Sequence, residues 1–154
     1  STFGKSTVEI AEIGCGGPYT ENCDPSTVGT SYAAPRLAKK IAELSTEFPM
    51  ASPQQSRFAV LVTARVPFTD RLFKQTLRPL AVKSGGFADI NAAKKLLENL
   101  NTWPKDLSAD SKEWIQLLYK SKSDQYEKLS ENKIKNLIKM QIQYFLNNKG
   151  IWYE

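Results

Sequence analysis

The stretch Gly29-Thr30-Ser31-Tyr32-Ala33-Ala34-Pro35 lies where a loop gives way to a helix. Residues 14–25 are rich in Gly, Pro, Asn and Asp, as loops are. From residue 31 onward, apolar residues recur at helical spacing: Ala34, Leu37, Ala38, Ile41, Ala42, Leu44 and Phe48. This spacing predicts an amphipathic helix over 31–48, which Pro49 ends. Ser31 therefore stands at a helix start, where unpaired N–H groups and the helix dipole favour negative charge.

The residues around Ser31 suit a serine nucleophile. Gly29 has no side chain, so a substrate backbone can approach closely. Ala33 and Ala34 are small, so the helix can pack tightly beneath the serine. Pro35 has no N–H to donate to the carbonyl of Ser31, which sets the first turn apart from the rest. The simpler interpretation is that this serine and the threonine before it only cap a core helix.

The run Gly29-Thr30-Ser31-x-Ala33-Ala34-Pro35 resembles the serine motif of the subtilase family of serine proteases. Other segments resemble parts of that family in the same order, and they are 1–4, 8–14, 52–57 and 86–93. The resemblance covers residues 1–100. It implies an α/β fold, the C-terminal portion of a subtilisin-like, mostly parallel sheet with flanking helices. It also implies that Ser31 is the catalytic nucleophile, supported by Gly29, Thr30, Ala33, Ala34 and Pro35.

Two positions depart from the family pattern. Glu12-Ile13 stand where Ala-Pro is usual, and Tyr32 stands where Met is common. Neither departure removes a catalytic group.

The chain contains no histidine, which is the commonest general base at neutral pH. The triad of subtilisin-type enzymes runs Asp, His, Ser along the chain, so the resemblance places the Asp, the His and the oxyanion-hole Asn before residue 1. We therefore expect two partners, the N-terminal part of the same protease and a peptide or protein substrate. Asp24, Asp70 and Asp89 are expected to cap turns and not to serve in a triad. The chain alone is expected to be inactive.

Periodicity and turn signals predict the other elements of residues 1–100. They are a strand over 7–13, a helix over 53–64, an irregular stretch over 65–84 with room for a short strand, a turn at Gly85-Gly86 and a helix over 92–100. Ser52 is the predicted N-cap of the helix over 53–64, with Pro53 at its first position.

Residues 101–154 are predicted to form a helical extension of the part formed by residues 1–100. Ser108 is predicted to cap a helix over 109–122, and a second helix over 124–147 ends before Gly150. We expect a helical hairpin packed on the protease body; the alternative is a partner-binding or regulatory extension. The lysines of this part are predicted to form a solvated face, and they include Lys133, Lys135, Lys139 and Lys149.

Length and charge bound the class of protein. A chain of 154 residues corresponds to one ordinary domain. The net charge of +5 is spread along the chain, so we expect a solvated basic surface and no nucleic-acid partner. No apolar stretch has transmembrane length, so no membrane partner is expected. The first residue is not Met, which suggests a processed or truncated chain.

Cys15 and Cys23 close a short loop. They would form a disulfide in an oxidising compartment or stay free thiols in a cytosol. Two cysteines without a histidine offer too few ligands for a zinc-type metal site. No cofactor is evident; the family resemblance allows calcium at no assignable site. The same resemblance weakly favours a secreted or extracytoplasmic location, and the compartment stays open.

Two functions compete. The first is a serine endopeptidase that hydrolyses peptide bonds with Ser31 once the N-terminal part is present. The second is a catalytically incomplete, subtilase-like module for protein interaction.

Overall fold

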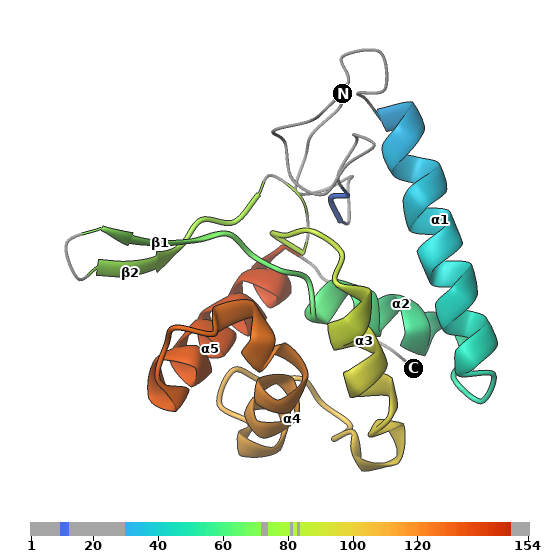
Figure 1. Cartoon of the computed structure of the whole chain (residues 1–154). Coiled ribbons are helices and arrows are strands. Elements are labelled where there is room, and N and C mark those ends of the chain that lie inside the picture. The colour runs from blue at the N-terminus through green and yellow to red at the C-terminus, as the bar shows by residue number, and fades with distance from the viewer. Residues whose placement is uncertain (1–9, 13–29, 72–73, 81, 83, 149–154) are drawn as a thin grey trace.

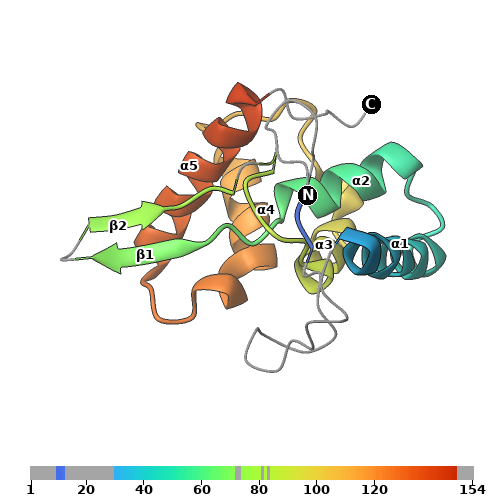
Figure 2. The ribbon, with the colours of Figure 1, turned by 90° about the horizontal axis from the view of Figure 1, so that it is seen from above.

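The structure, a computed structural model, describes residues 10–12, 30–71, 74–80, 82 and 84–148. This part of the chain has a mixed α/β fold that is mostly helical and contains one two-stranded antiparallel sheet. The elements are α1 (Thr30–Glu47), α2 (Pro53–Val62), β1 (Phe68–Arg71), β2 (Lys74–Leu77), α3 (Ile90–Leu97), η2 (Leu100–Thr102), α4 (Lys112–Lys122), η3 (Ser123–Tyr126) and α5 (Glu131–Asn147). Helix α1 stands at one edge of the molecule and the β1–β2 hairpin at the opposite edge (Figures 1 and 2).

Helix α2 begins where the sequence predicts. Ser52 Oγ accepts from the N–H of Gln55 at 3.1 Å, and Gln55 Oε1 accepts from the N–H of Ser52 at 2.8 Å. These two bonds form a capping box, and Pro53 occupies the first turn. The predicted N-cap is therefore confirmed.

The two C-terminal helices begin later than predicted. Ser111 caps α4, because its Oγ accepts from the N–H of Trp114 at 3.3 Å. Ser108 instead accepts from the N–H of Asp110 at 3.2 Å, within a turn. The predicted start at residue 124 is also wrong, since η3 occupies 123–126 and Ser130 caps α5. Helix α5 ends at Asn147, and Gly150 lies outside the described residues.

The stretch 65–84 is more ordered than the sequence suggests. Strands β1 and β2 pair antiparallel from Phe68 opposite Leu77 to Arg71 opposite Lys74. Pro67 and Pro79 flank the hairpin, where their lack of an N–H removes no ladder bond. The carbonyl of Pro67 still accepts from the N–H of Arg78 at 2.7 Å. The hairpin projects beyond the helices (Figure 1).

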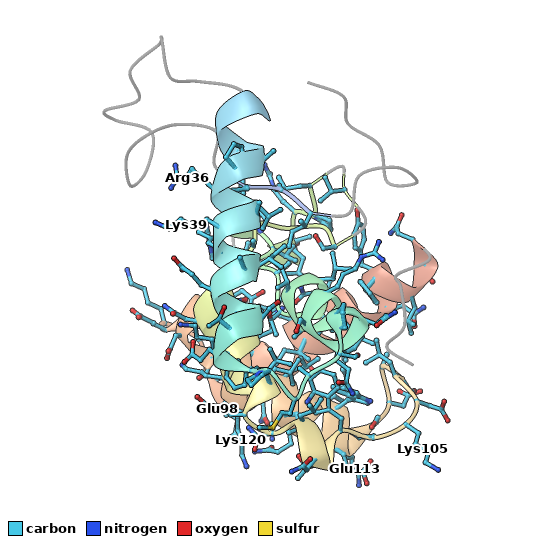
Figure 3. All side chains as sticks on the ribbon, turned by 90° about the vertical axis from the view of Figure 1, so that its right-hand side faces the viewer. Arg36, Lys39, Glu98, Lys105, Glu113 and Lys120 are labelled. Atoms are coloured by element: carbon cyan, nitrogen blue, oxygen red, sulfur yellow. The ribbon has the colours of Figure 1, made fainter. Side chains whose placement is uncertain are left out.

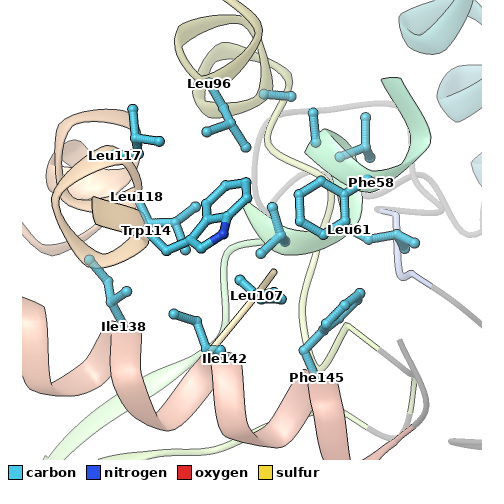
Figure 4. Close-up of a cluster of buried hydrophobic side chains, with 14 of the residues drawn as sticks. Phe58, Leu61, Leu96, Leu107, Trp114, Leu117, Leu118, Ile138, Ile142 and Phe145 are labelled. Carbon is cyan, nitrogen blue, oxygen red and sulfur yellow. The ribbon is translucent and has the colours of Figure 1, made fainter. Parts of the chain in front are cut away.

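The hydrophobic core lies between α2, α3, α4 and α5 (Figure 4). Phe58 from α2 is central to it. Its ring lies 5.5 Å from Trp103, 5.6 Å from Trp114 and 6.2 Å from Phe145, centroid to centroid and edge to face. Such pairs add about 0.5–1.5 kcal/mol each beyond the area that they bury. The core therefore takes side chains from both sides of residue 100; the division into 1–100 and 101–154 stays a prediction.

Candidate functional site

The predicted nucleophile lies in the first turn of α1. The helix begins at Thr30, so the backbone of Ser31 is its second residue, and Ala33, Ala34 and Pro35 follow within it. Pro35 has no N–H, so the carbonyl of Ser31, four residues earlier, receives no bond from that position of the helix. Gly29 lies outside the described residues. The predicted helix start at the motif is confirmed.

One face of α1 is uncovered. Of the α1 side chains that the structure describes, residues 33–47, only Leu44 is buried. Ala34, Ala38 and Ala42, at intervals of four residues, are all exposed. Position 31 precedes Ala38 by seven residues, so the helical repeat puts its backbone on the same face. Lys39, which is also exposed, projects outward from α1 (Figure 3).

The segments 10–12 and 86–88, which are far apart in the sequence, lie side by side. The N–H of Ala11 donates to the carbonyl of Gly86 at 3.0 Å, and the N–H of Ala88 donates to the carbonyl of Ala11 at 2.9 Å. These bonds form a parallel bridge between Ala11 and Phe87. On its other side, Phe87 forms an antiparallel bridge with Arg65, with bonds of 2.8 and 3.1 Å.

The backbone at Gly86 comes very close to Arg65. A Cβ added to Gly86 would lie 2.5 Å from the carbonyl oxygen of Arg65, closer than real Cβ atoms come. Gly85 has a φ of +73°, in the left-handed region that favours glycine. The predicted turn is confirmed, and each glycine has a steric reason to be there.

An ion pair ties the segment 10–12 to α1. Lys40 Nζ lies 2.8 Å from Glu12 Oε2, and the Glu12 side chain is only 5% exposed. A nearly buried carboxylate without its cation would be costly. Helix α1 and the paired segments are thereby fixed to each other.

A polar cavity of about 610 Å³ opens where α1, the segment 86–92 and the start of α3 meet. Basic side chains from α1, from α3 and from Arg65 line it together with acidic side chains. Its charged lining residues are Glu12, Arg36, Lys40, Glu43, Arg65, Asp89, Lys94, Lys95 and Asp124. The Arg65 guanidinium lies 5.4 Å from the centre of the Phe87 ring. A lining of this kind suits a charged or peptide-like ligand better than an apolar one.

Asp89 caps a helix, whereas the sequence predicted that it caps a turn. Its Oδ1 accepts from the N–H of Ala92 at 3.1 Å and so caps α3. Its Oδ2 accepts from Gln125 Nε2 at 3.0 Å. Asp70 lies in β1, and Asp24 lies outside the described residues, as do Cys15 and Cys23.

A buried lysine forms a cluster that the sequence analysis misses. Lys122 is fully buried, and its Nζ donates to the carbonyl of Ala64 at 3.1 Å. Gln141 Nε2 donates to the same oxygen at 2.8 Å, and Gln125 Nε2 donates to the carbonyl of Thr63 at 2.8 Å. Burial lowers the pKa of Lys122 to about 7, although the charge of Asp89 acts in the opposite direction.

A signal for Lys122 exists in the sequence. It follows Leu118 by four residues and Trp114 by eight, so helical periodicity places it on the buried face of α4. Because lysine side chains are usually exposed, a lysine at this position is not expected to be buried from the sequence alone.

The described residues contain no group of three or more metal-binding side chains. None of the helices in this part combines the length and apolar character needed to cross a lipid bilayer. Comparisons with protein-family models, with curated proteins and with solved structures found no match.

Proposed function

We propose that this chain is the nucleophile-bearing, C-terminal part of the catalytic domain of a subtilisin-like serine endopeptidase. The observation that carries the proposal is the position of Ser31, in the first turn of α1 and on a helix face that is left uncovered. A serine used only as a cap needs no such open face. A nucleophile must be reached by a substrate and by a base.

In the proposed reaction, the Ser31 hydroxyl attacks the peptide carbonyl and its proton passes to a histidine of the N-terminal part. The backbone N–H groups at the start of α1 stabilise the oxyanion, as unpaired donors at a helix start do. The histidine then protonates the leaving amine, and water releases the acyl group from Ser31. The Asp that orients the histidine and the oxyanion-hole Asn belong to the same N-terminal part.

The pairing between Ala11 and Phe87 supports this assembly. It is parallel, as a mostly parallel subtilisin-like sheet requires. In the proposed complete domain, further strands of the N-terminal part continue this sheet. Helices then flank the sheet on both faces, as buried parallel sheets require.

The test is covalent labelling of the complete assembly with a fluorophosphonate probe. We expect label on Ser31, and we expect Ser31→Ala to remove it and to lower kcat/KM by about 10⁴-fold or more. Ser45→Ala is the matched control, because Ser45 is an exposed serine of the same helix. Label that persists in Ser31→Ala, or turnover that stays near the wild-type value, contradicts the proposal.

The second candidate is a catalytically incomplete, subtilase-like interaction module. The absence of histidine from all 154 residues favours it. In that case the complete assembly is not labelled at all, and the uncovered face of α1 serves as a contact surface only.

A further inference from the structure

A polar groove with a volume of about 710 Å³ lies between α4 and α5, away from Ser31. Its charged residues are three lysines and one aspartate, so basic side chains outnumber acidic ones. The lining consists of Asp110, Lys112, Ile115, Gln116, Asn132, Lys135, Asn136 and Lys139. A net positive groove of this size favours an anionic occupant.

The two walls each carry a lysine whose charge is not compensated. Lys112 on α4 and Lys139 on α5 are exposed, and neither forms an ion pair with any residue that the structure describes. Lys135 is different, because it lies 2.8 Å from Glu131 Oε1 and 5.5 Å from the centre of the Tyr119 ring. The groove therefore presents the ammonium group of Lys135, which Glu131 holds in place, and those of Lys112 and Lys139, which have no ion pair with a described residue.

Between the lysines lie three exposed side-chain amides, those of Gln116, Asn132 and Asn136. Each offers both a donor and an acceptor, the same pair of groups that a peptide unit offers. None of the three forms a side-chain hydrogen bond with another described residue. Ile115, which is 6% exposed, provides an apolar floor.

The spacing of these residues matches an extended peptide. Residues of α5 in the groove fall into two pairs four apart, Asn132 with Asn136 and Lys135 with Lys139. Four residues of helix rise about 6 Å. In an extended chain, side chains two residues apart point the same way and lie about 6.6 Å apart. The spacing of alternate side chains in an extended segment therefore matches the spacing of residues four apart on α5.

We propose that this groove binds an extended acidic peptide segment of a partner protein, with carboxylates at alternate positions. The carboxylates pair with Lys112, Lys135 and Lys139. The side-chain amides of Gln116, Asn132 and Asn136 bond to the main chain of the peptide. Nucleic acid fits less well, because no aromatic side chain lines the groove to stack on bases.

The test is fluorescence anisotropy of the full 154-residue chain with a labelled octapeptide of alternating Glu and Thr. The same peptide with Gln in place of Glu is the comparison. We expect tighter binding of the Glu peptide, weakened by salt. Lys112→Gln and Lys139→Gln should each weaken binding about two- to five-fold and flatten its salt dependence. Asn136→Ala should weaken binding and leave the salt dependence unchanged.

Lys120→Gln is the matched control, because Lys120 is an exposed lysine of α4 (Figure 3). It is not among the residues that line the groove. All four side chains are exposed, so the variants should melt as the wild type does. Equal binding of the Glu and Gln peptides, or equal weakening by Lys120→Gln and Lys112→Gln, overturns the proposal. Displacement of the peptide by oligouridylate RNA or by phosphatidylserine vesicles, at lower concentration than by unlabelled peptide, overturns it in favour of that class.

Discussion

Lys122 donates from its Nζ to the carbonyl oxygen of Ala64 at 3.1 Å, in the interior of the protein. Ala64 lies just after the end of α2, where carbonyl groups have no helical N–H to accept from. Side chains from α4 and α5 supply the donors instead, Lys122 from one and Gln141 from the other. The end of α2 is therefore held by residues far along the chain.

The buried lysine makes stability depend on pH in the alkaline range. Its pKa is about 7 in the folded chain, against the ordinary 10.5. Between these values the unfolded chain binds more protons at this residue, so the free energy of unfolding rises with pH. Well below pH 7, Lys122 is protonated in both states, so it no longer makes the free energy of unfolding depend on pH. From pH 7 to pH 10, we expect the free energy of unfolding of the wild type to rise by roughly 3 kcal/mol relative to that of Lys122→Met.

Urea unfolding at several pH values measures this gain. At pH 7 Lys122→Met should be at least as stable as the wild type, because Met removes a buried charge and Gln141 still donates to Ala64. The exposed Lys120→Met is the control, and its stability should follow the wild type at every pH. Parallel curves for Lys122→Met and wild type would contradict a lowered pKa.

Phe58→Ala should destabilise the whole described core at once. Phe58 contacts Trp103, Trp114 and Phe145, so the variant leaves a cavity between α2, α4 and α5. We expect a loss of about 3–5 kcal/mol. Tryptophan fluorescence and far-UV circular dichroism should shift together to lower denaturant. The exposed Gln54→Ala on α2 should shift neither, and separate transitions for the two probes would show two units that unfold independently.

Gly86→Ala should disturb the contact between the segments around residues 65 and 86. The new Cβ meets backbone, the carbonyl of Arg65, which cannot rotate away as a side-chain tip could. We expect a loss of about 2 kcal/mol or more, measured by thermal unfolding. An unchanged melting temperature would mean that the two backbones do not approach this closely.

The 154-residue chain alone should hydrolyse no peptide. It has no histidine, and Lys122, whose pKa lies near 7, is fully buried and out of reach of a substrate. A fluorogenic peptide assay on the isolated chain should therefore give no signal. Addition of the N-terminal part that carries Asp and His should produce one. Hydrolysis by the isolated chain that Ser31→Ala abolishes would disprove the need for a separate base.

Local signals predict much of this fold. The N-cap at Ser52, with Pro53 after it, follows directly from the local sequence. So does the stripe on α5, including Gln141, which falls at an inward position and is buried. In each case the deciding residues lie within two helical turns of one another.

Other features depend on tertiary contacts that spacing does not contain. Ser108 and Ser111 are equally good caps in sequence, and the buried Trp114 decides between them. Its indole N–H donates to the carbonyl of Asp106 at 2.9 Å, which fixes the loop before the helix. For the candidate site, the motif identifies the helix of Ser31. The cavity next to this helix forms only when Ala11 pairs with Phe87, and no local sequence pattern specifies that pairing.

The anchoring of α2 also has a consequence for synthesis on the ribosome. Ala64 is separated from Lys122 by 58 positions and from Gln141 by 77. At about 5–20 residues per second, translation of that interval takes roughly 4–15 s. During this time the apolar side of α2, including Phe58, has emerged without the helices that cover it. We therefore expect the nascent chain to expose a site for chaperones until α5 leaves the exit tunnel.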